Sequence, residues 1–312
     1  MKQTIFTFLL LSVLSFTSCK KDKVYPNIKQ VDQQQILNYI SAHNLTGFVR
    51  DTVGGDTTGI YYKIIAPGSG PALTYSTQIA MVYTVQTFDG TYTSGDTISN
   101  HYYDYLGHVY LAHLPLGLQT AIINDLKNNG GRMRVLIPSH LAYGLAGTGS
   151  GSSQVANNRI AGNECLDYYV NLVNNFPVYD DMVIQNYMKD SSLTGYTKVQ
   201  SQLYPGNYYY YKIITPGTGT DYITINSTVT TTYTGQLFDA NQFGQYNVAG
   251  GTAENIADLV PGVQEGLERF ALMNTKISLL LPSTLGYGFT PPSTVLPFSC
   301  LRFTFIIDAV TP

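Results

Sequence analysis

The stretch RVLIPSHLAYG, residues 134–144, decides the fold, and it returns as SLLLPSTLGYG at residues 278–288. Each copy is an apolar run, a Pro-Ser step, a short turn and a Tyr-Gly pair. Proline has no N–H to give to a strand ladder, so a strand is expected to end at each proline. The two tyrosines, Tyr143 and Tyr287, are then expected at the mouth of the core that each strand helps to form.

Five further motifs recur in the same order around this stretch, at offsets that change only where loops differ in length. They pair residues 36–48 with 184–196, 62–70 with 211–219, 82–84 with 232–234, 116–119 with 261–264, and 165–168 with 300–303. Such long self-similarity indicates a tandem duplication. Two copies of this length predict two domains rather than a solenoid. We place them at residues 32–175 and 180–312, each beginning with a helical segment.

The composition favours strands and excludes a nucleic-acid-binding surface. The 312-residue chain has a net charge of −3 and only 12% charged residues, which leaves no basic field for nucleic acid. It holds 26 Tyr, which favour strands, and 29 Gly, which favour turns. We predict strands at residues 60–65, 79–87, 208–214 and 227–237, and one short helix per copy at 118–126 and 263–273. This order of elements describes an α+β fold.

Three smaller features complete the prediction. Asp32 is expected to cap a short helix, because Asp accepts hydrogen bonds from the first helical N–H groups. Cys165 and Cys300 hold equivalent places in the two copies, so each is expected as a buried thiol rather than as half of a disulfide. No metal site is predicted, because carboxylate or Cys partners at ligand spacing are missing around the three neighbouring histidines, His101, His108 and His113.

The N-terminus resembles a bacterial lipoprotein signal. Lys2 precedes an apolar run at residues 5–16 that is too short to span a membrane, and Thr17-Ser18-Cys19 follows. We expect residues 1–19 to be a signal peptide that ends at a lipidated Cys19, and residues 20–31 to be a polar tether. This predicts a cell-envelope protein held by lipid at the outer membrane, facing the periplasm or the cell surface. An ordinary secretory peptide is the alternative.

The order of the motifs resembles the FKBP-type peptidyl-prolyl cis-trans isomerases. The resemblance rests on a strand with Tyr-Thr-Gly, a helix entry at Pro-Gly, a strand that ends in Pro and leads to Tyr-Gly, and a last strand of alternating Phe. The second copy supplies these motifs at residues 233–235, 259–267, 282–288 and 301–305, and the first copy at 83–84, 117, 137–144 and 166–168. The resemblance implies two domains, each a twisted antiparallel β-sheet wrapped over one short α-helix.

The resemblance also implies a site and its chemistry. Such an isomerase needs no cofactor, metal or nucleophile, because a dry aromatic cleft that favours the twisted amide lowers the barrier to rotation about an X–Pro bond. Tyr143 and Tyr287 would donate the catalytic hydrogen bond to the substrate carbonyl. The proline pocket of the second copy would be formed by Tyr233, Phe243, Leu259, Val260, Val263, Val295 and Phe303. The pocket of the first copy would be formed by Tyr83, Tyr92, Leu114, Leu118, Ile160 and Tyr168.

Two departures from the family pattern bear on activity. The family's pocket floor is usually Trp, and Leu118 and Val263 stand there in this chain, while Thr93 and Gly244 replace the family's Asp. Weak catalysis is therefore expected. The predicted function is isomerisation of X–Pro bonds in unfolded or exported polypeptides by a monomeric protein. The alternatives are a non-catalytic peptide-binding protein or chaperone, and a glycan-binding lipoprotein suggested by the abundant Tyr and Thr.

Overall fold

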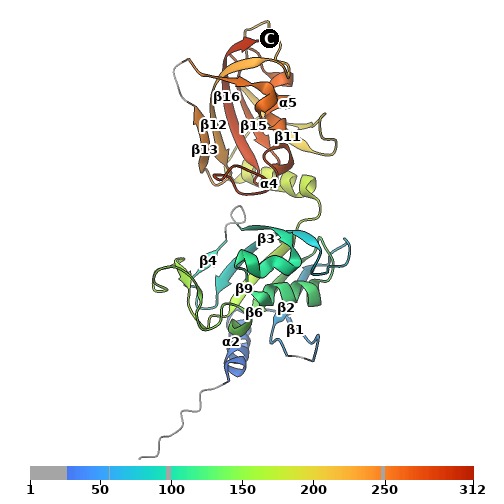
Figure 1. Cartoon of the computed structure of the whole chain (residues 1–312), viewed down its shortest axis with the longest axis vertical. Helices are drawn as coiled ribbons and strands as arrows, with labels where there is room; N and C mark the ends of the chain where they lie inside the picture. The colour runs from blue at the N-terminus through green and yellow to red at the C-terminus, as the bar shows by residue number, and fades with distance from the viewer. Residues whose placement is uncertain (1–26, 56, 96–99, 247–249) are drawn as a thin grey trace, which may run out of the picture.

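The computed structural model describes residues 27–55, 57–95, 100–246 and 250–312, and within them lie two seven-stranded antiparallel sheets with the same strand order (Figure 1). The first runs β1 (Val49–Arg50), β2 (Tyr61–Ala66), β6 (Arg132–Ile137), β9 (Leu166–Leu172), β3 (Gln78–Thr87) and β4 (Thr93–Ser94), and β5 (His101–Tyr105) also pairs with β3. The second runs β10 (Thr197–Gln200), β11 (Tyr208–Thr215), β15 (Lys276–Leu281), β16 (Leu301–Thr311), β12 (Thr228–Leu237) and β13 (Gln242–Tyr246), and β14 (Thr252–Asn255) also pairs with β12. The sequence repeat is thus a repeat of the sheet.

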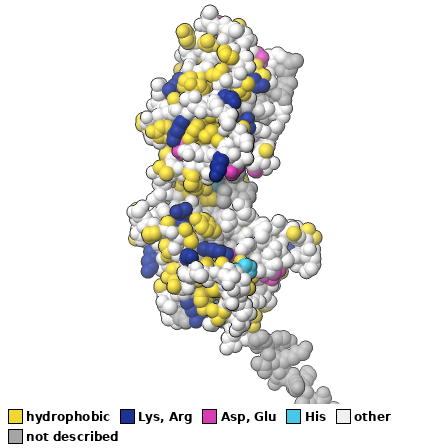
Figure 2. Space-filling view, turned by 180° about the vertical axis from the view of Figure 1, so that it is seen from behind, with side chains coloured by type: hydrophobic (Ala, Val, Ile, Leu, Met, Phe, Trp, Pro, Cys, Tyr) yellow, Lys and Arg dark blue, Asp and Glu magenta, His cyan; other side chains and the backbone are white. Residues whose placement is uncertain are grey.

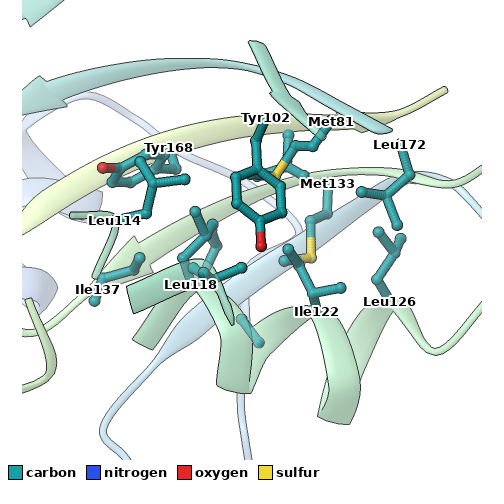
Figure 3. Close-up of a cluster of buried hydrophobic side chains, with 14 of the residues drawn as sticks. Met81, Tyr102, Leu114, Leu118, Ile122, Leu126, Met133, Ile137, Tyr168 and Leu172 are labelled. Atoms are coloured by element: carbon teal, nitrogen blue, oxygen red, sulfur yellow. The ribbon is translucent and has the colours of Figure 1, made fainter. Parts of the chain in front are cut away.

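One short helix packs on one face of each sheet. In the first copy, α3 (Leu116–Ala121) continues into the π-helical turn η2 (Ile122–Leu126); in the second it is α5 (Pro261–Phe270). Leu118 and Ile122 are fully buried and lie among Met133 and Tyr168 of the sheet (Figure 3). This confirms the predicted α+β class. Both helices begin two residues earlier than predicted, and α5 ends at Phe270, three residues earlier than predicted. Pro261 fits the first turn of α5, where the N–H groups have no partner within the helix, whereas Pro115 is the N-cap of α3.

A longer helix covers the opposite face of each sheet. These helices are α2 (Ile28–Ala42) and α4 (Phe176–Asp190), and each forms a small apolar cluster with the sheet. Cys165 belongs to the first cluster with Ile36, and Cys300 belongs to the second with Ile184. Both cysteines are free and buried, which confirms the prediction of buried thiols.

Asp32 does not cap the first helix, and this prediction was wrong. The helix begins at Ile28, and the side chain of Asn27 caps it by accepting a hydrogen bond from the N–H of Lys29 at 3.0 Å. The first helical turn therefore includes residues that had been predicted as tether. Asp32 is only 1% exposed, because its carboxylate accepts a hydrogen bond from Ser139, 107 positions away in sequence. A local capping rule cannot detect so distant a partner.

Short turns connect these elements and carry the residues singled out by the sequence. The 3₁₀ turns η3 (Ser139–Leu141) and η5 (Ser283–Leu285) directly follow the two prolines and lead to the turn tyrosines. The turns η1 (Leu106–Ala112) and η4 (Ile256–Asp258) precede the buried helices. The small ribbon of β7 (Thr148–Gly149) and β8 (Arg159–Ile160) lies within the first copy.

The first copy buries two carboxylates near the end of its helix. Asp125 in η2 is 9% exposed, and burial, followed by the nearby charge of Asp51, raises the pKa of Asp125 to about 7. Asp51 is 1% exposed and accepts hydrogen bonds from the N–H of Val53 and the hydroxyl of Thr58, both at 2.9 Å. Asp51 is therefore well satisfied, whereas ionisation of Asp125 is unfavourable in the folded protein.

Replacing Asp125 with Asn is expected to stabilise the protein near pH 8 and to change little near pH 4. The unfolded chain ionises this residue from about pH 4, whereas the folded chain keeps it protonated until about pH 7, so stability is lost as the pH rises through that window. The gain is on the order of 1–3 kcal/mol, because solvent screens part of the charge. Urea unfolding of wild type and Asp125→Asn across this range measures it, with the exposed Asp221→Asn as control. A gain that is the same at every pH would contradict the prediction.

Candidate functional site

The first copy contains a cavity of about 280 Å³ where four tyrosines meet. Its lining includes residues of β3, β7, β8 and β9, of the turn between β3 and β4, of the segment between η1 and α3, and of the turn after η3. Six of the residues predicted for this copy line the cavity: Tyr83, Tyr92, Leu114, Tyr143, Ile160 and Tyr168. The remaining predicted residue, Leu118, is not part of the lining, and it lies fully buried in the helix–sheet core (Figure 3). The structure thus brings together side chains from segments that are far apart in sequence.

The sheet register explains how the tyrosines converge. Tyr168 on the central strand β9 stands opposite Val135 of β6 on one side and Val85 of β3 on the other. Tyr83 lies two residues before Val85 on the same face, and its ring centroid is 5.8 Å from that of Tyr168. Tyr92 is held by the turn after β3, where its carbonyl accepts a hydrogen bond from the N–H of Thr87 at 2.9 Å. Alternation along adjacent strands therefore places the rings on one side of the sheet.

Burial keeps these hydroxyl groups protonated. It raises the pKa of Tyr83 to about 12, raises that of Tyr143, and raises that of the almost fully buried Tyr168 well above its ordinary value. A phenol in this environment is a hydrogen-bond donor at neutral pH and does not act as a base. The cluster can therefore bind an apolar group and offer O–H donors to a carbonyl oxygen.

The Tyr143 hydroxyl already has an acceptor within the protein. It donates a hydrogen bond to the carbonyl of His113 at 3.0 Å. His113 ends η1 in the left-handed conformation, with φ of 59°. At the equivalent place in the second copy, Asp258 ends η4 and the next residue, Leu259, is extended.

Sequence reasoning missed the polar part of this cavity. His113, Asn100 and a set of residues from the Gly-Ser-rich insertion also line it; the latter are Thr148, Gly149, Asn157, Asn158 and Arg159. The insertion folds back because β7 pairs with β8 and because Asn157 accepts a hydrogen bond from the N–H of Thr93 at 2.6 Å. Thr93 is the residue that stands where the resemblance places an Asp, and it is the backbone of this residue that binds the insertion. The feature of the sequence that could have indicated this polar lining was the long insertion before β9, the last strand of the first copy.

The predicted residues of the second copy gather in one apolar cluster. Its fully buried or nearly buried members are Val263, Val295 and Phe303, and packed against them are Tyr233, Phe243, Leu259, Val260 and Tyr287. The ring of Phe243 meets those of Tyr287 and Phe303 edge to face, with centroids 6.0 and 5.5 Å apart. The Tyr287 hydroxyl has no hydrogen-bond partner among the residues that the structure describes, and burial raises its pKa. This hydroxyl is therefore available to an external acceptor.

The described residues form neither a metal site nor a membrane-spanning helix. No group of three or more His, Cys, Asp or Glu side chains in that part of the chain is arranged to hold a metal ion. Across the same residues, no helix has both the length and the apolar character needed to cross a membrane.

Comparison with known proteins gave matches among solved structures only. No family model matches the chain, and no curated protein matches it. The crystal structure of FkpA from Escherichia coli has a TM-score of 0.36 and 23% identity over 44% of this chain and 61% of that chain. The three FKBP domains of wheat FKBP73 give a TM-score of 0.33 and 14% identity over 85% and 99%. A peptidyl-prolyl cis-trans isomerase from Pseudomonas syringae gives 0.36 and 21% over 45% and 99%. The architecture described above rests on this chain's own strand order and register.

Substituting Gly235 with Ala is expected to disrupt the second cluster. A Cβ atom there would lie 2.8 Å from Phe243 Cε2 and 3.0 Å from Phe303 Cε1, so the Phe243 ring must move, at a cost of about 1–3 kcal/mol. The matched control is Gly244→Ala on the paired strand, where the nearest atom lies at an ordinary 3.4 Å. Urea unfolding and near-ultraviolet circular dichroism measure the two effects. Equal destabilisation by both substitutions would show that the Phe243 contact is not the cause.

Proposed function

We propose that the chain is a peptidyl-prolyl cis-trans isomerase that acts on proline-containing unfolded or exported polypeptides. One repeated observation supports this proposal: in both copies the turn tyrosine lies against aromatic rings of the sheet, Tyr143 in the cavity with Tyr168, and Tyr287 beside Phe243. Rotation about an X–Pro bond is opposed by amide resonance, with a barrier of roughly 18–20 kcal/mol. A site that binds the twisted amide better than the planar one lowers that barrier without covalent chemistry.

In this proposal each copy supplies an apolar surface for the proline ring and one O–H donor. The rings exclude water from the amide, and the tyrosine hydroxyl donates to the substrate carbonyl as it rotates out of the plane. Tyr287 can do so directly, because its hydroxyl has no partner among the described residues. The Tyr143 hydroxyl must first break its hydrogen bond to the carbonyl of His113. We therefore assign the stronger activity to the second copy.

A non-catalytic peptide-binding or chaperone function is the second candidate, and the first copy supplies the observation that favours it. Its cavity has a satisfied tyrosine, and exposed leucines flank its lining in sequence: Leu111 is 58% exposed, Leu116 is 52% and Leu145 is 85%. Hydrophobic side chains also gather in patches over both copies on the face shown in Figure 2, with Lys and Arg side chains between them. Such apolar surface can hold unfolded segments without turning over an amide.

An isomerisation assay on the full chain separates the two functions. Tyr287→Phe is expected to lower kcat/KM on a proline peptide by about tenfold, since one hydrogen bond to the transition state is lost. Tyr143→Phe should have a smaller effect, because its hydroxyl is already bonded to the carbonyl of His113. The control is Tyr222→Phe, at a residue that is 77% exposed. If wild type and every variant show only background isomerisation while the wild type suppresses aggregation of an unfolded client, the chaperone function is favoured and the isomerase proposal is rejected.

We also propose that the protein is a monomer held at the cell envelope by lipid on Cys19. The support is the sequence alone, since Cys19 and the whole predicted signal lie outside the described residues. Several acyl chains on one residue hold a protein stably on a membrane.

Lipid attachment is tested by growing cells with a labelled fatty acid. The wild-type chain is expected to carry the label and to sediment with membranes, whereas Cys19→Ala should lose both properties. Cys165→Ala and Cys300→Ala serve as controls, because both thiols are buried in the folded copies. Label that persists in Cys19→Ala would show that Cys19 is not the residue that carries the lipid.

A further inference from the structure

Both copies bury one carboxylate between the long helix and the turn that carries the tyrosine. Asp32 of α2 and Asp180 of α4 are each only 1% exposed. They occupy equivalent positions, because each stands four residues before the buried isoleucine of its helix, Ile36 or Ile184. A buried acid is rare unless its oxygens are bound. Its repetition in two copies with different sequences indicates a shared role.

In the second copy, the carboxylate binds the first residue of the turn. Asp180 Oδ2 accepts hydrogen bonds from the backbone N–H of Ser283 at 2.8 Å and from its hydroxyl at 2.6 Å. The carbonyl of the same serine accepts the N–H groups of Gly286 at 3.1 Å and Gly288 at 3.0 Å. Tyr287 lies between these two glycines. The helix is thereby connected to both sides of the tyrosine through one fully buried serine.

The first copy repeats this arrangement, but Asp32 binds the backbone N–H of His140 instead of that of the serine, and Asp32 Oδ2 also lies 2.7 Å from Nδ1 of the same histidine. Asp32 Oδ1 accepts the Ser139 hydroxyl at 2.7 Å, and Oδ2 accepts the N–H of His140 at 3.2 Å. The Ser139 carbonyl accepts the N–H of Ala142 at 3.0 Å and that of Gly144 at 2.9 Å. Tyr143 again lies between the two bonded N–H groups. The carboxylate therefore holds the start of η3 just as its counterpart holds η5.

We propose that Asp32 and Asp180 are positioning residues for Tyr143 and Tyr287, acting through Ser139 and Ser283. Hydrogen bonds to a charged acceptor are about twice as strong as neutral ones, and a buried donor left without a partner is costly. The carboxylate therefore fixes the serine, and the serine carbonyl fixes the turn. This inference rests on the proposed function, because that function gives the two tyrosines their role as donors to the substrate carbonyl. The proposal also implies that the long helix of each copy, α2 or α4, helps to position the tyrosine of the site.

Amide hydrogen exchange on the full chain tests the connection without any assumption about activity. In Asp180→Asn, the N–H groups of Gly286 and Gly288 are expected to exchange roughly tenfold faster or more, while amides in the middle of β12 and β16 keep their rates. The matched control is Asp181→Asn, the next residue on the helix, whose carboxylate pairs with Lys198 at 2.7 Å. Unchanged rates at the two glycines in Asp180→Asn would overturn the proposal.

A second pair of variants covers the case in which Asp180→Asn loosens the whole sheet. Ser283→Ala removes only the hydroxyl bond and keeps the backbone bond to Asp180, and Asp32→Asn is read at the N–H of Gly144 in the other copy. Both are expected to speed exchange in the turn while the sheet stays protected. If neither does so, the carboxylates stabilise the helices alone and the proposal fails.

The isomerisation assay then separates positioning from general stabilisation. If Asp180 positions Tyr287, Asp180→Asn is expected to lower kcat several-fold with KM nearly unchanged, and adding Tyr287→Phe should cause little further loss. Independent, multiplicative losses in the double variant would overturn the positioning role. Faster exchange at the glycines in a protein whose wild type shows no isomerisation would retain the connection between helix and turn and reject the proposed function.

Discussion

The close approach of one short helix to each sheet is the constraint on which the rest of the structure depends. A Cβ at Gly117 would lie 2.5 Å from Ile137 Cγ2, and a Cβ at Gly262 would lie 2.7 Å from Leu281 Cδ2. Glycine at these equivalent positions lets helix and sheet meet without a void or a clash. Ile137 and Leu281 are also the last residues of β6 and β15. The same contact therefore fixes the point from which each Pro-Ser turn departs, and with it the place of the turn tyrosine.

On this common frame the two copies have developed different surfaces. In the first copy, a left-handed residue, His113, brings its carbonyl to Tyr143, and the inserted ribbon adds amides and Arg159 around the cavity. In the second copy, glycine replaces Val85, so that Phe243 can lie close to the sheet and against Tyr287. The site of the first copy is therefore polar at its edge, with its tyrosine hydroxyl bonded inside the protein. The site of the second copy is aromatic, and its tyrosine hydroxyl has no hydrogen-bond partner among the described residues.

The sequence predicted the parts of the fold that depend on local pattern or on repetition. The strands, the buried helices and the two thiols follow from alternation, turn residues and the constant order of motifs. The six predicted residues that line the first cavity came from the resemblance to a known family, and their role stays a prediction. The sequence did not predict the burial of Asp32, because its partner Ser139 is brought near only by the folded chain. The sequence also could not predict that the carbonyl of His113 accepts a hydrogen bond from Tyr143, because this contact depends on the positive φ of His113 and not on its imidazole.

The place of the last strand in each sheet has a consequence for how the chain folds as it emerges. β9 and β16 are the final strands of their copies, and each lies in the middle of its sheet, between β6 and β3 or between β15 and β12. Until that strand arrives, the earlier strands form two separate groups with open edges, which are prone to mispairing. Each copy must therefore close in a single late step, and the first can do so while the second is still incomplete. During synthesis, the half-formed sheet of each copy therefore exposes strand edges until its last strand is added.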